Sequence, residues 1–350
     1  MPILDKENKE QVKRYETFLR NYEGASAMQD LAWGKVKKEW VQEAVYIEKD
    51  GNIVAAMTIL LEKVPHFNSY LMYASRGPVC DVYDIELVKQ LVAEAEPIAK
   101  KYHAFALKFD PEVVYDETLE QKYIAEGFKV VGKHADKDEV IQPQYNMILD
   151  IDRVSEEELM KRFSEKTRYN IRLSKRKGVQ VYHSRKVEDL QIFYAIYKVT
   201  TMRDKIGCRA YEYFERMLEA YDEKHLRIYI AEHEGDKLSA AIAINYGGKL
   251  FYIYGASSNE KRNLMPNYAM QWEMIKWGLE TGCQKYDFGG VIVLDKDNGL
   301  YKFKNGFCKR EGPTEFIGEI TKVYQSGMYL LYAKCLPILK KIKRKLRKKK

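Results

Sequence analysis

The feature that most constrains how this chain can fold is an internal duplication, seen when the first half is laid over the second at a spacing of about 180 residues. In each half, alternating apolar residues flank an acidic residue followed by glycine, Asp50-Gly51 in the first and Glu234-Gly235 in the second. This pattern is typical of two strands joined by a tight turn. A third strand, an amphipathic helix and a fourth strand follow in both halves. We therefore expect two domains with the same order of elements.

The expected elements can be placed by residue number from these patterns. In the first half the hairpin spans 44–62, the third strand 70–79, the helix 85–101 and the fourth strand 104–112. In the second half the same elements span 227–247, 250–258, 266–280 and 285–290. Amphipathic helices are expected ahead of the two sets, at 9–22 and 29–38 and again at 155–177 and 187–200.

Length and composition agree with two folded domains. A chain of 350 residues exceeds what a single hydrophobic core usually supports, and 46% apolar residues with 27 tyrosines are unlike a disordered chain. We expect the first domain at 1–150, completed by residues 316–335, and the second at 151–315. Residues 336–350 are expected to form a separate basic tail.

The net charge of +8 is a property of this tail, because residues 340–350 hold nine Lys or Arg and no acid. The rest of the chain is close to neutral, which argues against a general coating for nucleic acid. Leu339, Ile342 and Leu346 recur at helical spacing among these cations. A short amphipathic helix on an anionic membrane would have this pattern, and a solvated tail or an RNA contact remain alternatives.

Several classes of protein are disfavoured by what the sequence lacks. No apolar run reaches the roughly 18 to 20 residues of a membrane helix, and the first residues lack the apolar stretch of a signal peptide, so we expect a cytoplasmic protein. The five cysteines and six histidines are scattered without metal-ligand spacing, and neither a Gly-x-Ser-x-Gly motif nor a P-loop occurs. We expect no metal, no disulfide and no nucleophilic intermediate.

The repeated order of elements resembles the fold of the GCN5-related N-acetyltransferases. This resemblance implies an α/β (α+β) fold of two tandem domains with mixed sheets. Acetyltransferases of this kind hold the coenzyme A pyrophosphate with a glycine-containing loop at a helix N-terminus. Residues 259–278 follow the corresponding strand without that loop, so we expect an acyl donor other than coenzyme A.

Several segments together are similar to the FemABX family of peptidoglycan interpeptide-bridge aminoacyltransferases. These segments lie at 28–37, 165–179, 207–217, 250–278, 285–291 and 299–307. The resemblance implies transfer of an amino acid from aminoacyl-tRNA to the side-chain amine of residue three in a peptidoglycan stem peptide. The acceptor is then UDP-MurNAc-pentapeptide or lipid II, bound on the side of the first domain, with aminoacyl-tRNA on the side of the second. It implies no cofactor, and we expect a monomer of the compact type that lacks a coiled-coil arm.

The resemblance also assigns residues to the acceptor. Lys37 and Arg209 match positions that bind its diphosphate, and a lysine ammonium and an arginine fork are the usual phosphate ligands. Tyr213 lies four residues after Arg209, so both would point the same way on a helix. Tyr254 would reach the acceptor from a strand. A solvated helix charge, or packing in the case of the tyrosines, is the plain alternative for each.

Three further residues are expected at the chemistry. Lys304, in the segment 299–307, matches a lysine beside the reacting ester, where a cation stabilises the developing oxyanion. Phe303 before it is a candidate wall for the terminal adenosine. Asp110 is a candidate general base, with a turn carboxylate before Pro111 as the plain alternative. Asp287 is interpreted as structural.

Two matters stay open at this level. Cations at Arg168, Arg172, Lys175 and Arg176 share one side of a predicted helix, and either a solvated face or a tRNA phosphate track would have this pattern. A tRNA-dependent transferase acting on protein N-termini, or a non-catalytic membrane- or RNA-binding protein, would have the same fold. The donated amino acid and the carrier of the acceptor are not specified by the sequence.

Overall fold

The computed structural model describes residues 3–133 and 140–335, and the tail expected at 336–350 lies outside the described residues. The chain divides into two compact units. The first unit comprises residues 1–144 and 315–350, and the second comprises residues 145–314. Within the described residues, no helix is both long and apolar enough to cross a membrane.

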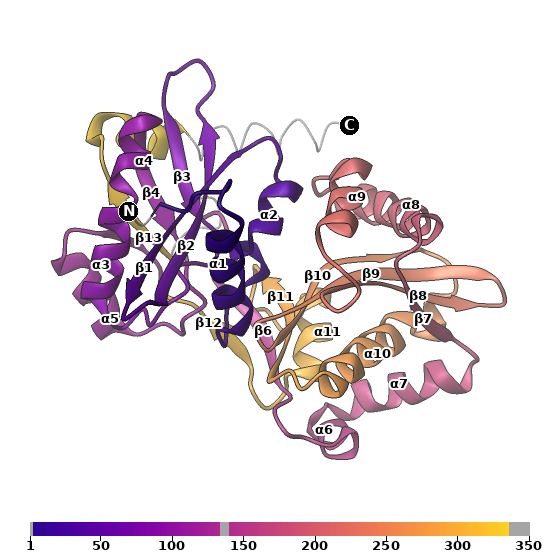
Figure 1. The fold of residues 1–350 in the computed structure, drawn as a ribbon. Helices are drawn as coiled ribbons and strands as arrows, with labels where there is room; N and C mark the ends of the chain where they lie inside the picture. Colours follow the sequence, from indigo (N-terminus) through magenta and orange to yellow (C-terminus); the bar gives the residue numbers. More distant parts are fainter. Residues whose placement is uncertain (1–2, 134–139, 336–350) are drawn as a thin grey trace. The chain divides into compact units, whose positions relative to one another are not determined.

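The first unit is built on a mixed sheet with the strand order β1-β2-β3-β4-β13-β5 (Figure 1). Only β3 and β4 pair in parallel, because α3 and α4 connect them. The strands are β1 (Val41–Lys49), β2 (Asn52–Lys63), β3 (Tyr70–Ala74), β4 (Ala104–Phe109), β5 (Lys129–Val131) and β13 (Glu319–Val323). The helices are α1 (Lys9–Asn21), α2 (Leu31–Val36), α3 (Ile85–Glu94), α4 (Glu96–Lys101) and α5 (Glu117–Ala125).

The second unit repeats this plan on a larger sheet, ordered β12-β6-β11-β10-β9-β8-β7. Its strands are β6 (Tyr145–Asp150), β7 (Gln180–Ser184), β8 (Leu226–His233), β9 (Asp236–Tyr246), β10 (Lys249–Ser257), β11 (Lys285–Val291) and β12 (Pro313–Glu315). Its helices are α6 (Glu156–Arg162), α7 (Glu165–Arg176), α8 (Val187–Asp204), α9 (Tyr211–Ala220), α10 (Pro266–Glu280) and α11 (Gly299–Phe307). Figure 1 shows α8 and α9 over one face of the sheet and α7, α10 and α11 over the other.

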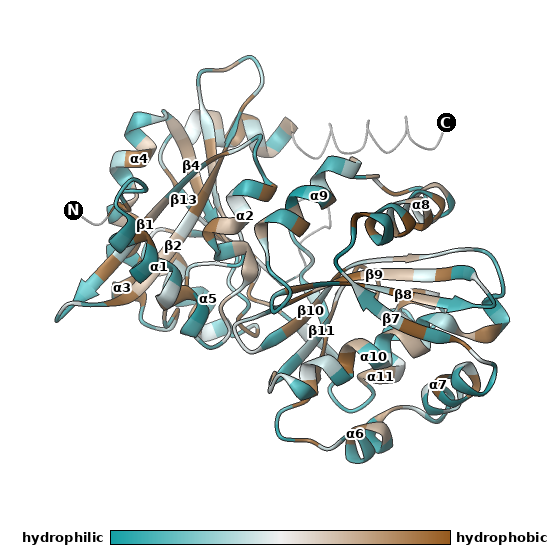
Figure 2. Ribbon diagram, turned by 45° about the vertical axis from the view of Figure 1, so that its right-hand side comes forward, coloured by the Kyte–Doolittle hydropathy of each residue, from teal (hydrophilic) through white to brown (hydrophobic). Residues whose placement is uncertain are grey.

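Both hairpins form where the sequence predicts them. Asp50 and Gly51 have φ of 52° and 77°, and Glu234 and Gly235 have φ of 51° and 87°, as the tightest hairpin turns require. A parallel pair, β3 with β4 and β10 with β11, follows in each unit. Figure 2 shows the apolar residues gathered in the strands of both sheets. The expected class, two tandem α/β domains with mixed sheets, is confirmed.

The boundary between the units differs from the expected one after Asp150. Strand β6 pairs with β11, from Lys285 opposite Asp150 to Val291 opposite Tyr145, so it belongs to the second sheet. The boundary therefore follows Gln144. Strand β13 returns to the first sheet, where it pairs with β4 and β5.

Two expected helices are interrupted. The helix expected at 85–101 breaks at Ala95, between α3 and α4, because Pro97 lacks the N–H that a continuous helix needs. The helix expected at 155–177 breaks at Phe163 and Ser164, where the Ser164 side chain accepts from the backbone N–H of Thr167 and starts α7 anew.

A buried ion pair joins β13 to the middle of the first sheet. The Lys108 ammonium lies 2.6 Å from a Glu319 carboxylate oxygen, and the other Glu319 oxygen accepts from the backbone N–H of Ile141. Lys108 and Glu319 are 4% and 1% exposed. Removing one partner of such a pair leaves the other charge buried and uncompensated.

Replacing Lys108 with Met should therefore destabilise the first unit by about 3 to 5 kcal/mol. The double variant Lys108→Met/Glu319→Gln should recover most of this loss, because the glutamine is neutral and its oxygen still accepts from Ile141. Urea unfolding of the wild type and both variants measures the effect. Equal midpoints for the single and double variants would show that the buried charge is not the cause.

Candidate active site

The centre of the second unit is organised by an irregularity in β11. The pairing of β11 with β6 shifts register between Asp287 and Gly290, and Gly289 has a φ of 76°. The fully buried Asp287 carboxylate accepts a 2.7 Å hydrogen bond from the backbone N–H of Gly289. This contact closes the bulge, and glycine is needed there because its φ lies in the left-handed region.

Two neighbours compensate the buried carboxylate of Asp287. The Asn146 side-chain amide donates to both of its oxygens, at 2.9 and 3.2 Å. The Lys249 ammonium lies 3.7 Å from one of them. A buried carboxylate needs such partners because its desolvation is costly. Asp287 therefore holds the bulge in place, which is the structural role that its carboxylate has in this unit.

Lys304 lies on α11 with its ammonium against this bulge. It is 5% exposed and donates a 2.9 Å hydrogen bond to the carbonyl of Gly290. Burial lowers the pKa of Lys304 to about 8, and the charge of Asp287 opposes this shift. An ammonium has three N–H groups, so donors remain for a bound oxyanion once Gly290 takes one.

Phe303 forms an aromatic surface beside Lys304 on the same helix. Its half-buried ring packs edge-to-face against Tyr268, with centroids 4.9 Å apart, and against Phe307 at 5.5 Å. These contacts fix the orientation of the ring, which suits it to packing against a flat ligand group. Its assignment as a wall for the terminal adenosine remains a prediction.

The structure brings Arg209, Tyr213 and Tyr254 together. Tyr213 lies on α9 and Tyr254 on β10 as expected, but Arg209 does not share the helix of Tyr213. Helix α9 begins at Tyr211 with Ala210 as its N-cap, so Arg209 lies in the preceding loop. Its guanidinium carbon is nevertheless 5.0 Å from the centroid of the Tyr213 ring. The Tyr254 hydroxyl donates to that of Tyr213 at 3.3 Å. An arginine and two hydroxyls can bind phosphate oxygens together.

Tyr197 on α8 supports this group and was not predicted from the sequence. Its hydroxyl donates to the carbonyl of Gly207 at 3.3 Å and accepts from the backbone N–H of Arg209 at 3.4 Å. Its ring lies edge-to-face with Tyr254 at 6.2 Å. In the sequence, Tyr197 stands out only by its place on the apolar side of a predicted helix, and such a position indicates packing rather than function.

In the first unit, Asp110 follows β4 and is 2% exposed. One carboxylate oxygen accepts from the Tyr73 hydroxyl at 2.9 Å, and the other accepts from the backbone N–H of Arg76 at 2.7 Å. Burial raises the pKa of Asp110 to about 7, against the opposing charge and N–H of Arg76. A carboxyl group with this pKa exchanges protons near neutral pH, as a general base must.

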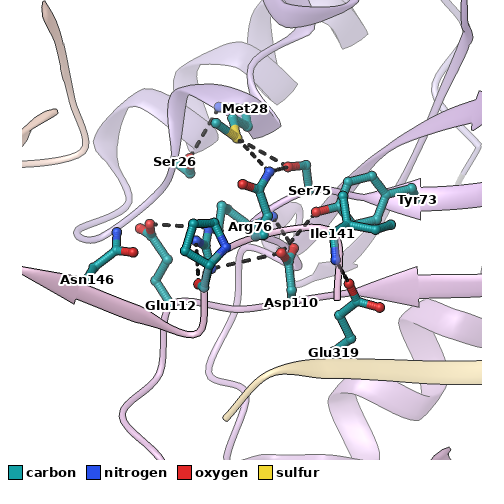
Figure 3. Close-up of polar contacts among 12 residues, drawn as sticks. Ser26, Met28, Tyr73, Ser75, Arg76, Asp110, Glu112, Ile141, Asn146 and Glu319 are labelled. Carbon is teal, nitrogen blue, oxygen red and sulfur yellow. Dashed lines mark hydrogen bonds and ion pairs between the residues drawn. The ribbon is translucent and has the colours of Figure 1, made fainter. Parts of the chain in front are cut away.

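Arg76 holds several groups around Asp110, as Figure 3 shows. Its guanidinium lies 3.9 Å from Asp110 and 3.6 Å from Glu112, and it donates to the carbonyl of Pro143 at 3.4 Å. Neither Tyr73 nor Arg76 was predicted from the sequence. They lie far from Asp110 along the chain and meet it only because β3 and β4 are parallel neighbours.

Lys37 occupies the C-cap of α2 and is half-buried. Its ammonium lies 5.9 Å from the ring of Trp33 and 6.0 Å from that of Trp40. Aromatic faces attract a cation and restrict its position. The proposed phosphate contact of Lys37 stays a prediction. Among residues 3–133 and 140–335, no group of His, Cys, Asp or Glu is arranged to hold a metal ion.

Comparison with known proteins finds relatives that match nearly the whole chain. A 39% identical relative over 338 residues, covering 94% of this chain and 98% of its own, is the UDP-N-acetylmuramoylpentapeptide-lysine N(6)-alanyltransferase of Weissella viridescens. A lipid II:glycine glycyltransferase of Staphylococcus epidermidis is 29% identical and covers 96% of this chain and 97% of its own.

Solved structures of other proteins have a similar fold. The crystal structure of FemX superposes with a TM-score of 0.84 and 28% identity, covering 92% of this chain and 98% of that one. A tandem GNAT protein from the clavulanic acid biosynthesis pathway, at 11% identity, has a TM-score of 0.55 over 92% of this chain and 97% of its own. The second likeness confirms the acetyltransferase-like fold of both units.

The model of the FemAB family matches residues 11–245 and 230–335, which together span most of the chain. The expected family resemblance is therefore confirmed by both sequence and fold. The chain belongs to the FemAB family.

Proposed function

We propose that this protein transfers an amino acid to the side-chain amine of the third residue in the stem peptide of a peptidoglycan precursor, and so builds the interpeptide bridge. The acceptor is UDP-MurNAc-pentapeptide or lipid II, as the names of the relatives indicate for those proteins. The observation that carries the proposal is a buried ammonium, Lys304, held with donors to spare in a member of the family. Such a cation fits acyl transfer, in which an oxyanion forms.

Aminoacyl-tRNA is the proposed donor, on the side of the second unit. Its ester is already activated, so the reaction needs neither coenzyme A nor a metal to proceed at a useful rate. The acceptor amine attacks the ester carbonyl, the new C–N bond forms, and the C–O bond to the tRNA breaks. The amine loses a proton and the departing tRNA hydroxyl gains one.

Lys304 is proposed to stabilise the oxyanion of this tetrahedral intermediate. One well-placed donor contributes roughly 3 to 4 kcal/mol to the transition state of related acyl transfers. Phe303 is proposed to pack against the terminal adenosine. Asp110 is proposed as the base that takes the amine proton, in a supporting role, because positioning of an activated ester supplies most of the rate.

Arg209, Tyr213 and Tyr254 are proposed to bind the acceptor phosphates, since a guanidinium with two hydroxyls nearby matches their oxygens. Lys37 is proposed as a further phosphate contact. We propose a monomer that acts in the cytoplasm, where charged tRNA is found. For the tail, residues 336–350, we propose contact with the inner face of the plasma membrane.

Radiolabel transfer tests this function directly. Purified protein is incubated with a set of charged tRNAs and with UDP-MurNAc-pentapeptide, lipid II or a model protein bearing a free N-terminus. Transfer to either precursor supports the proposal and identifies both the amino acid and the carrier. Transfer to the model protein alone, or to none of the three, would overturn it.

Replacing Lys304 with Met should lower the transfer rate at least tenfold, because the charge at the ester is lost. Affinity for the acceptor should change little. Lys302→Met is the matched control, since Lys302 lies on the same helix with an exposed side chain that pairs with Asp297. A Lys304→Met enzyme as fast as the control would remove Lys304 from the mechanism.

Replacing Arg209 with Met should chiefly weaken acceptor binding, by tenfold or more, because a charge-assisted phosphate contact contributes about 1.5 to 3 kcal/mol. Isothermal titration with UDP-MurNAc-pentapeptide measures the affinity. Lys205→Met serves as the control, because it removes an exposed cation that also precedes α9. Unchanged affinity in Arg209→Met would place the phosphates elsewhere.

The transfer rate should follow a bell-shaped pH profile. Its acid limb falls below pH about 7 as Asp110 takes up a proton, and its alkaline limb falls above pH about 8 as Lys304 loses its charge. Asp110→Asn should flatten the acid limb, and Lys304→Arg should move the alkaline limb upward. Profiles identical to that of the wild type in both variants would contradict these assignments.

A further inference from the structure

Helix α7 has one buried side and one exposed side of quite different character. Thr167, Asn170, Ile171 and Ser174 face the interior. On the opposite side Tyr169, Arg172 and Arg176 follow one another at spacings of three and four, with Lys175 on the flank. We call these four exposed residues the basic ridge. Figure 2 shows α7 largely in the colour of hydrophilic residues.

The cations of this ridge are not neutralised within the described part of the chain. No carboxylate lies within ion-pair distance of Arg172, Lys175 or Arg176 there, whereas Lys261 elsewhere in the second unit is paired with Glu234 and Asp236. Like charges at helical neighbours repel, so this helix carries an unfavourable term that a bound polyanion would remove. Arg168 was expected to belong to the same row of cations, but we leave it out of the ridge because its guanidinium donates to the carbonyl of Phe163 at 2.6 Å.

The start of α7 is locked to the helix that carries Lys304. The backbone N–H of Ser164 donates to the carbonyl of Gly306 at 2.8 Å. A Cβ at Gly306 would lie 2.3 Å from the Thr167 hydroxyl, so the absence of a side chain permits this close approach. The helix that bears the basic ridge is therefore attached directly to the helix that carries Lys304.

We propose that the basic ridge binds the RNA backbone of the donor. This rests on the proposed function, in which the reacting ester terminates an RNA chain. RNA fits better than a membrane surface, because Tyr169, at 55%, is the only prominently exposed large hydrophobic residue of α7, a helix that the structure describes throughout. An amphipathic membrane helix needs a row of apolar side chains, whereas one aromatic ring among cations suits a nucleotide base beside phosphates.

The test compares two double variants with the same change in net charge. Arg172→Glu/Arg176→Glu alters the ridge, and Lys9→Glu/Lys13→Glu alters two exposed cations of α1 in the first unit. Binding of fluorescently labelled, deacylated tRNA is followed by anisotropy across a salt series. The ridge variant should bind at least tenfold more weakly than the control variant at low salt. The slope of log Kd against the logarithm of the salt concentration should be smaller for the ridge variant by about one to two, because two phosphate contacts are lost.

Tyr169 provides a second measurement that does not depend on charge. Tyr169→Ala should weaken tRNA binding several-fold and Tyr169→Phe should leave it nearly unchanged, because stacking needs only the ring. Equal tRNA affinity of the two charge variants would overturn the proposal. So would a ridge variant that keeps its tRNA affinity but loses binding to vesicles with a third anionic lipid.

Failure of the proposed function can be told apart from failure of the ridge. A short donor, an aminoacyl ester on a dinucleotide, is too small to reach from Lys304 along α7. The ridge variant should use this donor as well as the wild type does, although it uses full-length charged tRNA poorly. A wild type that transfers from neither donor would disprove the transferase function itself, whereas equal use of charged tRNA by wild type and ridge variant would disprove only the ridge.

Discussion

The carboxylate of Asp287 is the group on which the centre of the second unit depends. It is buried in the middle of a sheet, where an ionised group persists only with partners, and Asn146, Lys249 and the N–H of Gly289 provide them. Its bond to Gly289 shapes the bulge, and the bulge offers the carbonyl of Gly290 to Lys304. The same negative charge opposes the effect of burial on the Lys304 pKa. One residue thus helps to position the proposed oxyanion-stabilising cation and favours its charged form.

Much of the fold could be predicted from local sequence. The hairpins at Asp50-Gly51 and Glu234-Gly235 were predicted because turn residues and strand alternation are short-range signals. The domain boundary could not be placed as well. Strand β6 looks the same whichever sheet it joins, and only its pairing with β11 decides. The break at Ala95 was missed although Pro97 signalled it.

The candidate site divides in the same way. Lys304 and Arg209 were predicted through a family resemblance and Asp110 as a carboxylate that could act as a base, but the environments of all three depend on contacts between distant segments. Burial of Lys304 and its bond to Gly290 could not be anticipated from residue spacing, nor could the contact of Tyr73 with Asp110, which requires two strands to be parallel neighbours. Arg209 reaches Tyr213 from a loop, so the correct grouping was predicted from an incorrect local structure.

The return of β13 to the first sheet has a consequence for how the protein is made. Ribosomes deliver the chain from its N-terminus, so β4 emerges long before β13, the strand that covers its edge. Until then Lys108 lacks Glu319, and an open strand edge is exposed to neighbouring chains. The second unit, whose strands lie within 145–315, can complete its sheet while the first still waits. The insertion of one unit into the sequence of the other therefore reverses the usual order of maturation, and the segment translated first is the last to be finished.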